Sequence, residues 1–144
     1  MQFRKLGRDG AENMYRTILN VEGATITTGL PVSIRPTAAS LDGVSAVVAN
    51  ATADYFGFIG IAHEDIANND YGLVQVNGLV NSILISNAGS SITITAGDCL
   101  LPGTIGFYSG AAPTEAASNG KGVWVVDTKT VSAAGYVRGL LAVL

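Results

Sequence analysis

The chain has 144 residues, of which 48% are hydrophobic and only 13% are charged, and its formal net charge is −3. This length suits a single domain with its own core, which needs no metal or disulfide set to hold it. The acidic balance, without a basic stripe, argues against nucleic-acid binding. Because no run of about eighteen apolar residues occurs, the sequence predicts no helix that spans a membrane.

The low charge is the most informative feature of the composition, because an average soluble domain has about 25% charged residues. Ser, Thr, Asn, Gly and Ala must then cover much of the surface, and such a surface loses its water at little cost. The composition therefore predicts a surface that is largely buried in an oligomer or lattice. An ordinary β domain rich in small residues is the alternative.

The first 23 residues differ from the rest, because they carry four of the eight Lys and Arg residues, at Arg4, Lys5, Arg8 and Arg16. Residues 11–19 could form a short helix, and an extended arm fits the pattern equally well. We therefore predict an N-terminal arm over residues 1–23 and a β-barrel domain over residues 24–144. We expect a chain that lacks residues 1–16 to remain folded and to bind its partner more weakly.

From residue 24 onward, short apolar and β-branched runs lie between Gly, Pro, Asn and Asp residues. Such runs predict β-strands. We expect the strands at residues 24–28, 31–35, 44–48, 55–62, 72–76, 79–86, 91–95, 104–109, 123–127 and 135–143. With 18 glycines and only 7% aromatic residues, this pattern predicts an all-β fold. It would be a compact antiparallel β-barrel or sandwich of about eight to ten short strands, with the N-terminal arm attached.

Several turns between these strands have a recognisable cause. Asn77-Gly78 predicts a two-residue hairpin turn, because both residues tolerate positive φ. Asn87-Ala88-Gly89 and Ala96-Gly97-Asp98 predict further turns, and the small residues from 109 to 122 predict an exposed loop.

Two of the expected strands carry further detail. Ile92 and Ile94 alternate with Thr93, which predicts a strand buried on one face. Gly60 lies inside the run of residues 55–62, where a glycine predicts a bulge or a barrel bend.

The residues that could carry catalysis or bind a metal are few. His63 is the only histidine and Cys99 the only cysteine, and no nucleophile elbow accompanies them, so we expect no enzyme and no catalytic residue. Cys99 lies in an apolar run, which predicts a buried structural thiol. Residues 63–70 are rich in the oxygen ligands that calcium prefers, but their spacing lacks the helix–loop–helix calcium pattern. We expect a solvated turn or an interface loop there, and neither a metal nor a cofactor.

Two segments could instead contact a partner. Trp124 is either a core residue or an interface anchor. The apolar C-terminal run is either a closing strand or a strand that faces another subunit. With the basic start of the chain, these segments give a candidate subunit or capsid interface: Phe3, Arg4, Lys5, Leu6, Arg8, Arg16, Trp124, Leu140, Leu141 and Leu144.

Three stretches, at residues 60–78, 92–103 and 133–141, carry a resemblance. Their order is a strand, an acidic turn, a Tyr-Gly strand and an Asn-Gly turn, then an Ala-Gly-Asp-x-Leu turn and a late Gly-rich strand. This order resembles the small β-barrel head decoration, or cement, proteins of tailed bacteriophages, over about residues 44–144. The first 23 residues have no counterpart in the resemblance.

The resemblance implies a homotrimer that binds the major capsid protein on the outer surface of an icosahedral virion, after assembly in the host cytoplasm, and stabilises the capsid. It brings no catalytic residues. One alternative is a receptor- or glycan-binding knob of a phage head or tail fibre. Another is a small β-barrel hydrolase, which would have to use His63.

Overall fold

The computed structural model describes residues 13–34, 43–50, 57–86, 91–103, 106–109, 122–132 and 134–142. This part of the chain contains β-strands and no helix, so the predicted all-β fold class is confirmed. In particular, no helix among these residues has the length and hydropathy needed to cross a membrane. The strands are β1 (Met14–Asn20), β2 (Pro31–Ile34), β3 (Ser45–Val48), β4 (Phe58–Ala62), β5 (Tyr71–Ser86), β6 (Ile92–Ile94), β7 (Cys99–Gly103), β8 (Gly106–Ser109), β9 (Gly122–Val125), β10 (Lys129–Val131) and β11 (Ala134–Ala142).

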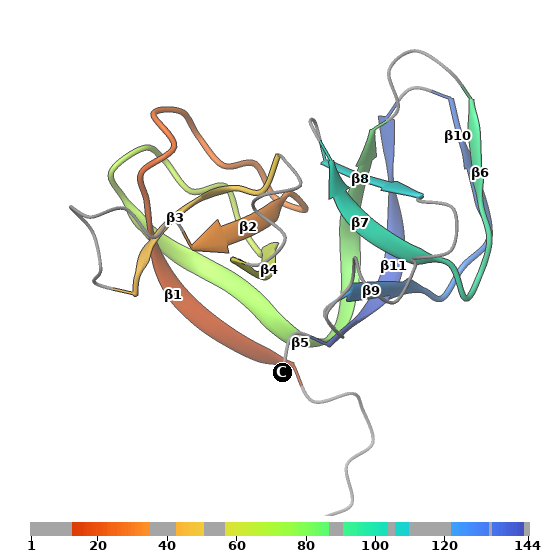
Figure 1. Ribbon diagram of the computed structural model, residues 1–144, viewed down its shortest axis with the longest axis horizontal. Coiled ribbons are helices and arrows are strands. Elements are labelled where there is room, and N and C mark those ends of the chain that lie inside the picture. Colours follow the sequence, from red (N-terminus) through yellow and green to blue (C-terminus); the bar gives the residue numbers. More distant parts are fainter. Residues whose placement is uncertain are drawn as a thin grey trace, which may run out of the picture.

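Nine of these strands form one sheet that closes on itself twice. The first ring, β1-β3-β2-β4-β5, is closed by the pairing of β1 with β5, and we call it the first barrel. The second ring, β5-β11-β9-β7-β8, is closed where Ile85 of β5 pairs with Phe107 of β8, and we call it the second barrel. β6 and β10 form a separate two-stranded ladder, which lies at the outer end of the second barrel (Figure 1).

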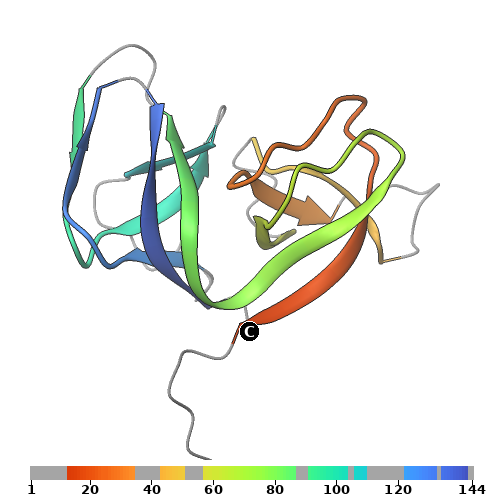
Figure 2. The same cartoon turned by 180° about the vertical axis from the view of Figure 1, so that it is seen from behind.

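The 16-residue strand β5 belongs to both barrels. Its first half pairs with β1 and β4, and its second half pairs with β11. Figures 1 and 2 show it as one curved ribbon that runs from one lobe of the molecule to the other. The predicted hairpin turn at Asn77-Gly78 is therefore wrong. Gly78 does have a positive φ of 101°, but this conformation bends a continuing strand because both halves find partners on either side of the bend.

Each barrel has its own hydrophobic core. The core of the first barrel consists of Ile18, Ile26, Val32, Ala46, Ala62, Ile66 and Val74. The core of the second barrel consists of Phe58, Ile61, Val80, Ile83, Ile85, Ile94, Leu100, Val123, Val125, Val137 and Leu141. Phe58 and Ile61 come from β4 of the first barrel, so this strand packs the two barrels together.

The start of the described chain departs from the prediction. Met14–Asn20 is strand β1, parallel to β3 and antiparallel to β5, and Ile18 is fully buried. The possible helix is wrong for these residues, because sheet partners on both sides satisfy the backbone. Deleting residues 1–16 would cut into β1, so we no longer expect that deletion to leave the fold unchanged. Residues 1–12 lie outside the described part.

Residues 24–28 were also predicted as a strand, and this prediction is wrong. The segment makes one isolated bridge, in which the backbones of Ile26 and Ile66 exchange two hydrogen bonds of 2.9 Å. Gly23 and Gly29 flank it with φ of 90° and 88°, so the backbone turns away before a ladder can grow. Sequence reasoning also missed the short strands β7 and β10.

Other local predictions are confirmed. Ile94 is buried and Thr93 is exposed. In the turn at 96–98, the Asp98 backbone N–H donates to the Thr95 carbonyl at 3.0 Å, and a carboxylate oxygen of Asp98 accepts from the Thr95 N–H at 2.8 Å. The β2–β4 register shifts opposite Gly60, which marks the expected irregularity. The predicted turn at 87–89 and nearly all of the predicted loop at 109–122 lie outside the described residues.

Candidate functional site

Trp124 and Leu140 lie side by side on the outside of the second barrel. They are direct neighbours across β9 and β11, and 39% and 47% of their surfaces are exposed. The core interpretation of Trp124 is therefore wrong, because Val123 and Val125 take the inward positions of this short strand. Leu141 is fully buried in the core, so it is not available for the interface that the sequence suggested.

The remaining predicted interface residues divide into two groups. Arg16 is exposed on β1, where its guanidinium donates to the carbonyl oxygen of Gly43. The others lie outside the described residues: Phe3, Arg4, Lys5, Leu6, Arg8 and Leu144.

Two further apolar side chains, Val126 directly after β9 and Tyr136 on β11, are also exposed. We call these two residues, together with Trp124 and Leu140, the apolar face. Sequence reasoning missed Val126 and Tyr136, although alternation along β11 signals the second, since residues 136, 138 and 140 are exposed while 137, 139 and 141 are buried. The exposed residues therefore form an outer surface on β9, β11 and the residue that follows β9.

An ion pair between Arg138 and Asp127 lies beside the apolar face. Arg138 donates two hydrogen bonds to the carboxylate of Asp127, from Nε at 2.5 Å and from Nη2 at 2.7 Å. The hydrogen bond from Arg138, with its positive charge, lowers the pKa of Asp127, and the same bond raises the pKa of Arg138. The pair thus stays ionised with no net charge, as a planar guanidinium and carboxylate favour.

Cys99 pairs with Trp124 in the β7–β9 register and is buried. Burial raises the pKa of its thiol, which keeps it in the unreactive protonated form. The predicted buried structural thiol is confirmed.

Carboxylates of the acidic segment 63–70 accept hydrogen bonds from residues of neighbouring segments. One oxygen of Asp65 accepts from the backbone N–H and the hydroxyl of Thr28, at 2.7 and 2.8 Å. Glu64 accepts from the N–H of Leu73 at 2.9 Å. The two hydrogen bonds from Thr28 lower the pKa of Asp65, and the bond from the backbone N–H has the larger effect. Within the described ranges, no three His, Cys, Asp or Glu residues are grouped so that they could hold a metal ion.

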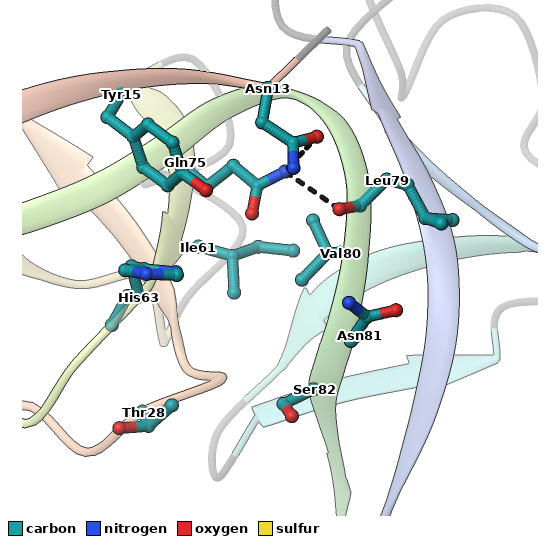
Figure 3. Close-up of a pocket in the computed structure, with 11 residues that line it drawn as sticks. Asn13, Tyr15, Thr28, Ile61, His63, Gln75, Leu79, Val80, Asn81 and Ser82 are labelled. Carbon is teal, nitrogen blue, oxygen red and sulfur yellow. Dashed lines mark hydrogen bonds between the residues drawn. The ribbon is translucent and has the colours of Figure 1, made fainter. Parts of the chain in front are cut away.

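A cavity of about 130 Å³ lies where the start of β1, the end of β4 and the middle of β5 meet (Figure 3). We call it the cleft. Its polar side chains are those of Asn13, Tyr15, Thr28, His63, Gln75, Asn81 and Ser82, and its apolar ones are those of Ile61, Ala62, Leu79 and Val80. Among the described residues, no Asp, Glu, Lys or Arg side chain lines the cleft. Residues far apart in the sequence thus form one site, which sequence reasoning missed because only the bend of β5 brings them together.

Gln75 is the buried polar residue of the cleft, with 3% of its surface exposed. Its Nε2 lies within hydrogen-bond distance of three oxygens: the side-chain oxygen of Asn13 at 3.2 Å and the carbonyls of Asn77 at 3.2 Å and Leu79 at 3.0 Å. Three acceptors at one end of the amide require the nitrogen there. The amide oxygen therefore points into the cleft, as Figure 3 shows.

His63 lies at the other side of the cleft against an aromatic ring. Its ring centroid is 4.8 Å from that of Tyr15, and the planes meet at 63° in an edge-to-face contact. No hydrogen bond joins the His63 side chain to a Ser, Thr or Cys side chain within the described part. This geometry lacks the nucleophile–base contact that a hydrolase based on His63 would need.

Comparison of the chain with models of known protein families and with curated protein sequences gives no match.

Proposed function

We propose that this chain is a structural virion protein that decorates the outer surface of an icosahedral phage capsid and stabilises it, assembled as a homotrimer. The observation that carries the proposal is the apolar face, with Trp124 and Leu140 exposed as neighbours on adjacent strands. The resemblance of residues 44–144 to decoration proteins supports the choice of a capsid as the partner. The proposal assigns no catalytic role to any residue.

The chemistry of the face suits protein–protein contact. Tryptophan and tyrosine are the residues that most often dominate binding energy at interfaces, because they bury a large area at a small cost in side-chain entropy. Two of the described charges beside the face, those of Arg138 and Asp127, neutralise each other, and Lys129 is held by the backbone carbonyl of Tyr136 at 2.8 Å. A partner would therefore have few ions to desolvate when it covers this surface.

The size of the face favours an assembly with many contacts. A stable pairwise interface buries about 1,200–2,000 Å² in total, which is more than four partly exposed side chains supply. A trimer on a repetitive shell would present several such faces at once, and linked contacts raise the apparent affinity without new interactions.

The apolar face can be tested with a matched pair of double variants. Trp124→Ser with Leu140→Ser removes the centre of the face, while Tyr71→Ser with Leu73→Ser removes an aromatic and a leucine that are exposed on β5 in the first barrel, at 63% and 38%. Co-sedimentation with phage heads that lack this protein measures binding, and light scattering measures the oligomeric state. We expect at least a tenfold loss of binding for the first variant only.

Two outcomes would contradict the proposal. One is wild-type protein that stays monomeric and never sediments with heads. The other is equal binding by wild-type protein and both double variants, which would place the contact elsewhere. Circular dichroism on all three proteins separates loss of binding from loss of folding.

A further inference from the structure

We propose that the cleft binds one neutral, hydroxylated ring, a single monosaccharide unit. This goes beyond the proposed capsid role and does not depend on it, because none of the four side chains of the apolar face lines the cleft.

The charge of the lining restricts the ligand first. The side chains around the cleft are amides, hydroxyls, aromatic rings and aliphatic groups. Among the described residues of the lining, an anionic phosphate or carboxylate would find no Lys or Arg side chain, and a cation would find no carboxylate. Bringing an ion into such a site would cost desolvation without compensation. The chemistry of the lining thus selects an uncharged ligand.

Gln75 supplies a fixed acceptor for that ligand. Its nitrogen is held by Asn13 and by the carbonyls of Asn77 and Leu79, so its oxygen cannot turn away from the cleft. No described residue donates to this oxygen. A hydroxyl group that enters would find an acceptor already oriented, which avoids the entropic cost of ordering it on binding.

The aromatic side of the cleft, formed by Tyr15 and His63, restricts the shape of the ligand. Tyr15 is 42% exposed, and its contact with His63 holds the ring in place. Because the two rings meet at 63°, they do not form the parallel slot that a planar base would fill. A single ring face suits the C–H side of a sugar, and the hydroxyls at the sugar's edge can both donate to Gln75 and accept from Asn81.

The volume of the cleft limits the size of the ligand. Sites for drug-sized ligands occupy about 300–1,000 Å³, and the cleft has about 130 Å³. It therefore takes one ring, with the rest of a glycan extending into solvent. A ring held by so few groups binds weakly, with a dissociation constant on the order of 1 mM. Several copies on one particle would strengthen binding to a surface that displays the sugar.

The test is titration of the ¹⁵N-labelled full chain with glucose, galactose, mannose and N-acetylglucosamine, each to about 100 mM, followed by amide chemical shifts. Uridine and acetamide serve as neutral probes that are not sugars. Tyr15→Ala and Asn81→Ala change exposed lining residues, and Tyr71→Ala removes a tyrosine that is 63% exposed outside the cleft. A dispersed spectrum verifies the fold of each variant.

We expect at least one sugar to cause saturable shifts at residues of the cleft. Tyr15→Ala and Asn81→Ala should each weaken that binding at least fivefold, and Tyr71→Ala should leave it unchanged. If Tyr15→Ala perturbs the fold, the sugar binding of Asn81→Ala alone tests the proposal. The proposal is overturned by the absence of saturable shifts with every sugar, by equal shifts with uridine or acetamide, or by shifts that the folded cleft variants retain. Capsid binding is measured separately, so failure here leaves that proposal standing.

Discussion

The two barrels share a strand but use their polar and apolar residues differently. In the first barrel, buried polar side chains hold the loops: Asn20 is fully buried, and its Nδ2 donates to the carbonyls of Ala24 and Ile66, both at 2.8 Å. The second barrel is closed by a single residue pair between β5 and β8. Its outer surface carries the apolar face. A single shared strand can therefore join two different lobes. The first barrel is held by internal hydrogen bonds, and the second barrel exposes apolar side chains on its outside.

The largest expected effect tests whether the barrels unfold as one unit. Leu141→Ala in the second barrel and Ile18→Ala in the first each remove a fully buried aliphatic side chain. Each should lower the free energy of unfolding by about 3 kcal/mol. Because β5 and the β4 residues Phe58 and Ile61 join the barrels, both variants should shift one common transition. Circular dichroism reports the whole fold, and Trp124, the only tryptophan, reports the second barrel.

Separate unfolding would give a different result. If Ile18→Ala moved the transition seen by circular dichroism but left the Trp124 fluorescence transition in place, the barrels would be independent units, despite their shared strand.

The second prediction concerns the hydrogen bonds that distinguish the first barrel. Asn20→Ala removes the donor to Ala24 and Ile66 and also the oxygen that accepts from the Glu22 N–H at 2.8 Å. Leaving such groups unpaired should cost about 2 kcal/mol of stability in urea unfolding. The matched change Asn81→Ala removes an exposed asparagine and should alter stability by less than about 0.5 kcal/mol. Equal effects would contradict the special role of Asn20.

The third prediction concerns the bend that separates the two halves of β5. Gly78→Ala places a Cβ at a residue whose φ is 101°, and should cost about 1 kcal/mol. Gly97→Ala is the comparison, because Gly97 has a φ of 95° in a true turn and an added Cβ meets nothing within 4 Å. We expect similar losses in thermal unfolding for both. If Gly78→Ala left the thermal stability unchanged, β5 would not need a positive φ at residue 78.

The smallest expected effect is the dependence of stability on pH. Thr28 lowers the pKa of Asp65 in the folded chain below its ordinary value of 3.8. The stabilisation is thus complete above that value and is lost as the pH falls through the lower, folded-state pKa. Asp65→Asn keeps an accepting oxygen but cannot titrate, so its stability should change less than that of wild-type protein between neutral pH and pH about 2. Parallel pH curves for the two proteins would contradict this.

Much of the local structure could be predicted from sequence. The alternation of Ile92 and Ile94 with Thr93 gave the correct buried side, and the apolar run around Cys99 gave its burial correctly. These predictions succeeded because the period of two and the local hydrophobicity belong to a short segment alone. The same signals left Trp124 open between core and interface, because its neighbours are equally apolar and only the closure of the sheet determines which side faces the core.

Asn77-Gly78 marks the boundary between the two kinds of information. The sequence by itself determined that this dipeptide favours positive φ, since that preference is a property of the two residues and their own backbone. Only the tertiary structure decided whether the chain would reverse there or bend and continue. That choice depends on distant partners, β1 and β4 before the bend and β11 after it, and the same choice creates the cleft and separates the two cores.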